Sequence, residues 1–96
     1  MWRVKIEIEA SRVFSGKALS TEDRLVIHRW AVEVANHGPN ILQKRPDIWA
    51  DHALTGKWFG YRASSFSYRG RIIYRVENDV VTVVVVRISP DHDYRK

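Results

Sequence analysis

The chain has 96 residues, of which 45% are apolar and 28% charged, and it contains no cysteine. This composition predicts a single globular domain over residues 1–96, and it excludes a disordered chain, a disulfide scaffold and a thiolate metal site. The formal charge of +5 favours a polyanionic partner, namely RNA, DNA or an acidic protein segment.

Two segments bear on membranes and export. The Val-rich run 80–86 is far shorter than the roughly 20 apolar residues of a membrane span. The first ten residues, MWRVKIEIEA, alternate apolar and charged side chains and have no h-region of a signal peptide. We therefore expect a cytoplasmic protein without a membrane partner.

The first half of the chain predicts one strand and one helix. Apolar and charged residues alternate over 2–8, as in a half-buried strand. Segment 10–19 is ambiguous and could hold a short helical turn that Gly16 ends. Ser20-Thr21-Glu22-Asp23 offers cap chemistry for a helix that runs to about Asn36, where Gly38-Pro39 stops it.

The second half predicts three strands joined by turns. Residues 40–56 indicate a loop with one helical turn near 47–53, and strands follow at 57–66, 71–76 and 80–88. The last strand lacks polar alternation and should be central. We expect an α+β fold: a small, mostly antiparallel four-stranded sheet that includes the N-terminal strand, with helices packed on one face.

Strand alternation assigns the side chains to faces. Arg71, Ile73 and Arg75 share one face of their strand, and Arg62 and Ser64 point together on theirs. Since the helices cover one face, the opposite face is free to gather arginines into a shallow basic groove. We expect Arg75 to be structural and to pair with Glu77 or Asp79 at the sheet edge.

The segment GYRASSFSYRGRIIYRVENDVVTVVVVR, residues 60–87, resembles the C-terminal sheet of the RelE/ParE superfamily of bacterial toxins. The likeness rests on Arg-Ile-Ile-Tyr at 71–74, the acidic turn at 77–79 and the Val-rich strand that ends at Arg87. The order of elements agrees in the N-terminal half. The resemblance implies a RelE-like fold and an antitoxin as partner.

The resemblance also implies one of two activities. RelE-like members are metal-independent endoribonucleases that cut mRNA on the ribosome, whereas ParE-like members inhibit DNA gyrase. His92 and Tyr94 match in type the terminal residues of the ribonuclease branch and favour it. A toxin-fold protein without catalysis, which binds an antitoxin or RNA, stays open as a third interpretation.

The ribonuclease branch implies roles for individual residues. Arg71 and Arg87 would clamp the scissile phosphate, His92 would act as general acid or base, and Tyr94 would stack a base or assist proton transfer. The expected RNA-binding residues are Lys57, Arg62 and Ser64. RelE has lysine where this chain has Ser64, which is a departure from the pattern.

No cofactor or metal is expected. Asp51-His52 resembles half of a metal site without a second half, so His52 receives no role. The expected partners are mRNA, the ribosome and an antitoxin whose acidic segment would complement the +5 charge and cover the groove. DNA gyrase is the partner under the alternative interpretation.

Overall fold

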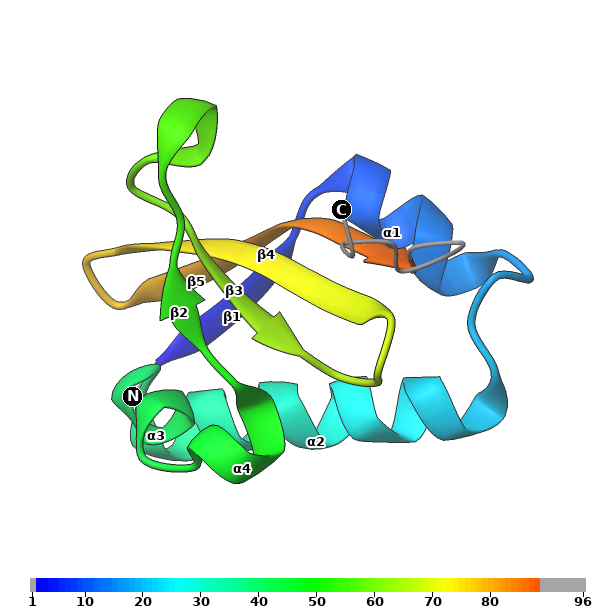
Figure 1. Ribbon diagram of the computed structural model, residues 1–96, viewed down its shortest axis with the longest axis horizontal. Coiled ribbons are helices and arrows are strands. Elements are labelled where there is room, and N and C mark those ends of the chain that lie inside the picture. Colours follow the sequence, from blue (N-terminus) through cyan, green and yellow to red (C-terminus); the bar gives the residue numbers. More distant parts are fainter. Residues whose placement is uncertain (1, 89–96) are drawn as a thin grey trace.

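The computed structural model describes residues 2–88 and shows a five-stranded mixed sheet with helices against one face (Figure 1). The strands are β1 (Arg3–Ile6), β2 (His52–Ala53), β3 (Arg62–Ser65), β4 (Gly70–Glu77) and β5 (Val80–Ile88). Their order is β1-β5-β4-β3-β2, with β1 parallel to β5 and every other pair antiparallel. The predicted α+β class is confirmed. The strand count was one too low, because a two-residue strand leaves no periodic pattern in a sequence.

Four helices accompany the sheet: α1 (Ile8–Ser15), α2 (Thr21–His37), α3 (Asn40–Gln43) and α4 (Pro46–Trp49). The helix predicted from cap chemistry is α2. Ser20 Oγ accepts a hydrogen bond from the Asp23 amide at 3.0 Å, and Asp23 returns one from the Ser20 amide at 3.1 Å, which is a capping box. Gly38 ends the helix at φ +86°, a conformation that favours glycine.

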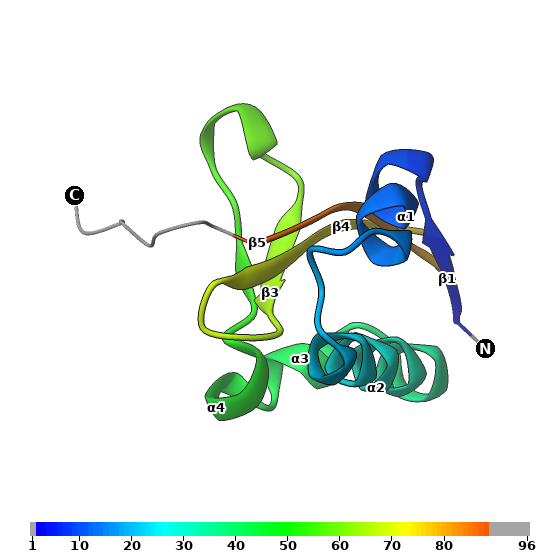
Figure 2. The ribbon, with the colours of Figure 1, turned by 90° about the vertical axis from the view of Figure 1, so that its right-hand side faces the viewer.

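Two predicted strands are shorter than expected. β1 ends at Ile6, and residues 8–15 form α1 instead of continuing the strand. In the predicted strand 57–66, residues Gly56–Trp58 form a 3₁₀ turn, η1, and only 62–65 are extended. Gly56 and Gly60 have φ of +67° and +96°, which breaks a strand on both sides of the turn. The β2–β3 hairpin therefore projects from the sheet, away from α2 (Figures 1 and 2).

The main core lies between the sheet and the helices, as the side view shows (Figure 2). Trp30 of α2 meets Tyr74 of β4 edge to face, with ring centroids 5.4 Å apart. From β5, Val81, Val83 and Val86 face this core. β5 lies between β1 and β4 and is buried along most of its length, as its uninterrupted valines predicted.

The other face of the sheet, here called the open face, is only partly bare. Ala63, Ile73 and Val84 form a small buried cluster on it. The projecting hairpin covers this cluster with half-buried apolar side chains: Leu54, Trp58 and Tyr61. Only the part of the open face beyond this cover remains available for polar side chains.

A β-bulge decides which residues of β5 reach the open face. Ile73 pairs with Val85, but Tyr74 pairs with Val83, so Val84 is the extra residue. Arg71 and Arg75 are four positions apart, whereas their partners Arg87 and Thr82 are five positions apart. The extra residue places Thr82 and Arg87 on the same face of the sheet. Without the bulge, strand alternation would have placed these two residues on opposite faces.

No helix within residues 2–88 combines the length and the apolar character that crossing a bilayer requires.

We predict that Gly70→Ala destabilises the protein by roughly 1–3 kcal/mol. A Cβ at this position would lie 2.3 Å from Cζ of Phe66, whose ring is buried, so ring and strand would have to shift. Urea unfolding monitored by circular dichroism measures the loss. Gly16→Ala is the control, because its Cβ would meet nothing closer than 3.3 Å at an ordinary φ of −84°. Equal unfolding midpoints for the two variants would contradict the packing argument.

Candidate functional site

Two arginines face each other across the open face. Arg71 of β4 and Arg87 of β5 are directly paired in the antiparallel register. Directly opposite side chains in such a pair have Cβ atoms roughly 5 Å apart, and like charges there repel. Neither arginine has an acidic partner within residues 2–88. A bound anion such as a phosphate group would relieve this repulsion.

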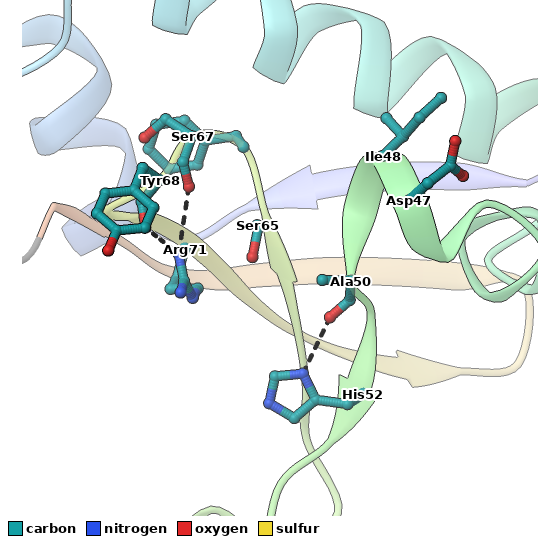
Figure 3. A pocket seen from close by; sticks show the side chains of 9 residues that line it. Asp47, Ile48, Ala50, His52, Ser65, Ser67, Tyr68 and Arg71 are labelled. Carbon is teal, nitrogen blue, oxygen red and sulfur yellow. Dashed lines mark hydrogen bonds between the residues drawn. The ribbon is translucent and has the colours of Figure 1, made fainter. Parts of the chain in front are cut away.

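Backbone carbonyls hold Arg71 in place. Its Nη1 donates to the carbonyl oxygens of Ser67, Tyr68 and Gly70 at 3.3, 3.2 and 2.9 Å (Figure 3). The turn between β3 and β4 thus fixes the guanidinium without neutralising its charge. Nε and Nη2 remain for a ligand, which is the geometry that binds a phosphate oxygen pair.

Arg71 opens onto a cleft of about 640 Å³. The cleft is lined by Asp47, Ile48, Ala50, His52, Ser65, Phe66, Ser67, Tyr68 and Arg71. In the close view, Ser65 lies between Arg71 and His52, and the carboxylate of Asp47 is turned away from both (Figure 3). A histidine and an arginine therefore share one cleft of a size typical of ligand sites.

A hydrogen bond orients His52. Its Nδ1 lies 3.1 Å from the carbonyl oxygen of Ala50. A carbonyl oxygen only accepts, so Nδ1 carries the proton in this contact. In the neutral ring, Nε2 then has a free lone pair and can take a proton from a ligand.

The other predicted contact residues lie elsewhere. Lys57 is exposed on η1 at the tip of the projecting hairpin and does not line the cleft. Arg87 is exposed beside Arg71 and lies outside the cleft wall itself. His92 and Tyr94 fall outside the described residues.

Arg62 and Ser64 lie on the helix-facing side of β3, across the sheet from Arg71. Both donate to the carboxylate of Asp51, whose side chain is fully buried: Arg62 Nε at 2.7 Å and Ser64 Oγ at 2.7 Å. Ser64 itself is fully buried and accepts the indole N–H of Trp30 at 3.0 Å. The shared direction of Arg62 and Ser64 is as predicted, but it leads to a core network instead of the basic groove. Arg62 and Ser64 therefore do not face the side of the sheet that carries Arg71 and Arg87.

Tyr74 is the third donor to Asp51, through its hydroxyl at 2.5 Å. Burial, together with the hydrogen bond and charge of Asp51, raises the pKa of Tyr74 well above its usual range. For Arg62, burial works to lower the pKa, but the hydrogen bond and charge of Asp51 outweigh it, and the net shift is upward. Arg62 thus stays charged and Tyr74 stays neutral at physiological pH.

Arg75 is structural, although its partner differs from the expected one. Its Nη1 lies 3.3 Å from Oε2 of Glu7, which follows β1, and not beside Glu77 or Asp79. The parallel pairing of β1 with β5 brings residue 7 across the sheet, a contact between residues 68 positions apart that local reasoning does not see. The pair is partly exposed, so its contribution to stability is small.

His52 and Asp51 are the residues that sequence reasoning missed. Because residues 40–56 were predicted to be mainly a loop, neither side chain was assigned to a face of the sheet. In β2, His52 pairs with Ala63 and so joins the open face, while Asp51 turns inward. No local signal could have found them, because a strand of two residues leaves no periodic pattern in the sequence.

The described part of the chain contains no cluster of side chains that could bind a metal ion. Among residues 2–88, no three His, Asp or Glu side chains come close enough together to hold one ion.

The raised pKa of Tyr74 predicts the alkaline behaviour of the fold. A tyrosine whose folded-state pKa exceeds the unfolded value of about 10 stabilises the protein below pH 10, and this contribution falls by roughly 1.4 kcal/mol per unit above it. Tyr74→Phe should therefore cost about 1–3 kcal/mol at pH 8 but show a flatter decline above pH 10 than the unmodified protein. Urea unfolding at pH 8 to 11 tests this. Tyr61→Phe, outside the network, should keep the original slope; parallel curves for all three proteins would contradict the assignment.

Comparison with known proteins gives a fold. No protein-family model matches the sequence, and no curated protein does. Among solved structures, a chain of the heterotetrameric YoeB–YefM toxin–antitoxin complex from Staphylococcus aureus superposes with a TM-score of 0.71 at 11% identity. The alignment covers 93% of this chain and 98% of that one.

Two further structures agree. The archaeal RelE–RelB complex from Pyrococcus horikoshii matches with a TM-score of 0.69 at 14% identity, over 91% of this chain and 93% of that one. The DinJ–YafQ toxin–antitoxin complex from Escherichia coli matches with a TM-score of 0.67 at 14% identity, over 91% of each chain. The sheet order, the helices on one face and these superpositions show that the chain has a RelE-like α+β fold.

Proposed function

We propose that this chain is the toxin of a toxin–antitoxin pair and an endoribonuclease that cleaves mRNA at the ribosome and so inhibits translation. It would act without a cofactor, in the cytoplasm where ribosomes translate. The fold supports the toxin role, and the chemistry of the open face supports the activity.

The single observation that carries the proposal is the Arg71–Arg87 pair. Arg71 and Arg87 are paired residues of adjacent strands, so their like charges repel, and neither has an acidic partner in the described residues. Folding tolerates this repulsion, and a phosphodiester placed between the two groups turns it into attraction. In the transition state the phosphorus carries additional negative charge, which a fixed pair of cations stabilises more than the ground state.

His52 would supply the base. Its Nε2 takes the proton of the ribose 2′-OH, the 2′-oxygen attacks phosphorus, and the bond from phosphorus to the 5′-oxygen breaks. The leaving oxygen receives a proton, so the products are a 2′,3′-cyclic phosphate and a 5′-hydroxyl. The hydrogen bond to Ala50 holds the ring in the tautomer that this step requires.

The remaining groups take supporting roles in this proposal. His92 is the candidate for protonating the leaving oxygen, and Tyr94 for stacking a base or assisting proton transfer. Lys57, at the hairpin tip, would contact a more distant phosphate of mRNA or of the ribosome.

The proposed partner in the resting state is an antitoxin with an acidic segment. The formal charge of +5 and the two arginines of the open face, which have no acidic partner within residues 2–88, favour such a segment by electrostatic complementarity. An antitoxin that covers the cleft would exclude RNA from Arg71 and His52 together.

We predict that Arg71→Ala and His52→Ala each reduce mRNA cleavage at least about 100-fold, since each removes a group that stabilises or starts the phosphoryl transfer. The measurement is primer extension on mRNA in a reconstituted translation reaction with purified protein. Arg87→Ala should also lose activity, because one cation cannot hold both phosphate oxygens.

Arg75→Ala is the matched control. It removes the same side chain from the same strand and face, but its partner is Glu7 and it lies outside the cleft. It should cleave at the original rate. If Arg71→Ala and Arg75→Ala behave alike, the clamp is wrong; if mRNA stays intact while the protein blocks DNA gyrase supercoiling, the ribonuclease proposal fails as a whole.

A further inference from the structure

A second cavity, of about 250 Å³, lies on the helix-covered side of the sheet. Its walls come from the residue before β1, the end of α2, α3 and the strands β3 and β4. The side chains that matter are Trp2, His37, Asn40, Gln43, Arg62 and Val76. Because Arg62 and Arg71 point to opposite faces of the sheet, this cavity is separate from the cleft described above.

The polar groups of this cavity are mainly hydrogen-bond donors. No Asp or Glu lines it. Gln43 Nε2 donates to Asn40 Oδ1 at 3.5 Å, which occupies the Asn40 oxygen and leaves the Asn40 amide group to donate. The indole of Trp2 can only donate. Convergent donors without a carboxylate select an anion.

Trp2 is seated here by Gly38. A Cβ on residue 38 would lie 2.7 Å from Nε1 of Trp2 and 3.0 Å from its Cε2, so only glycine lets the indole lie this close to the end of α2. The positive φ of Gly38 independently excludes most side chains. The indole of Trp2 is thereby held at the wall of the cavity.

Arg62 decides what kind of anion fits. Its Nε is taken by Asp51 and its guanidinium also interacts with the hydroxyl of Tyr74, but within residues 2–88 no further carboxylate binds its terminal nitrogens. The buried Asp51 already balances most of the charge of Arg62. A singly charged carboxylate therefore suits this guanidinium better than a phosphate chain, which needs uncompensated cations.

Size and apolar surface narrow the ligand further. The cavity is smaller than the roughly 300–1,000 Å³ of typical cofactor sites, and Val76 and the ring of Trp2 add apolar wall. We propose that this cavity, the carboxylate pocket, binds a carboxylate on a short apolar stem. The group comes either from an acidic side chain of a protein partner or from a free small carboxylic acid, and the inference does not depend on the ribonuclease activity.

Titration of ¹⁵N-labelled protein with sodium butyrate tests this, at constant ionic strength against sodium chloride. The indole N–H signal of Trp2, assigned with Trp2→Phe, should shift saturably at millimolar butyrate. Asn40→Asp and Gln43→Glu place a negative charge in the pocket and should weaken binding at least about tenfold. Both positions are exposed, so both variants should fold, which their spectra verify.

Asn36→Asp is the matched control, because it makes the same chemical change at an exposed position of α2 outside the lining. It should bind butyrate like the unmodified protein. A parallel titration with N-acetyl-Ala-Glu-Ala-amide distinguishes the sources: tighter binding than butyrate identifies a protein side chain, and weaker binding identifies a free acid.

Three results would overturn the proposal. One is a shift that does not saturate or that chloride reproduces. Another is equal weakening in Asn36→Asp and Asn40→Asp, which would reflect net charge only. The third is tighter binding of inorganic phosphate or a short RNA than of butyrate at this resonance, which would make the pocket part of a nucleic-acid surface.

Discussion

The buried carboxylate of Asp51 is the interaction on which the rest of the structure depends. It accepts hydrogen bonds from Arg62, Ser64 and Tyr74, and Ser64 in turn accepts one from Trp30. One side chain thus ties the start of β2 to β3, β4 and α2. A buried charge is costly unless its hydrogen bonds are complete, and removing one partner of such a pair typically costs roughly 3–5 kcal/mol. The network therefore permits very little variation in how the β2–β3 hairpin meets the sheet.

This constraint has a direct consequence for the cleft. Residue 52 follows Asp51, so anchoring Asp51 inside turns His52 to the open face. The same anchor fixes Arg62 at the wall of the carboxylate pocket. One core network thereby positions a side chain in each of two cavities on opposite faces of the sheet.

The partners of the arginines, and not their number, decide what each one does. Arg62 is balanced by Asp51, and Arg75 is paired with Glu7. Arg24 donates to the carbonyl oxygens of Phe14 and Gly16, at 2.8 and 2.6 Å, and closes the connection between α1 and α2. Arg71 is held by carbonyl oxygens and, among the described residues, has no carboxylate to balance its charge beside Arg87. The net charge therefore favours a polyanionic partner in general, whereas the partners of each arginine indicate which side chains would be available to bind it.

Much of the fold follows from local rules that act over a few residues. Helix capping and strand burial leave recognisable patterns in a sequence. Those patterns made three features predictable: the capping box of Ser20 and Asp23, the helix end at Gly38 and the Val-rich strand before Arg87. The short elements between residues 40 and 61 could not be predicted in this way. Helices of four residues and a strand of two are stabilised by packing and leave no periodic pattern in the sequence.

The sequence by itself determined the α+β class and the main helix, and it suggested Arg71 as the centre of the basic site proposed above. Only the tertiary structure decided which side chains join it. The bulge at Val84 turns Arg87 toward Arg71, the pairing of β2 with β3 adds His52, and Asp51 draws Arg62 and Ser64 into the core. Each of these depends on a register or a contact between distant residues, and the alternation of a single strand does not encode it.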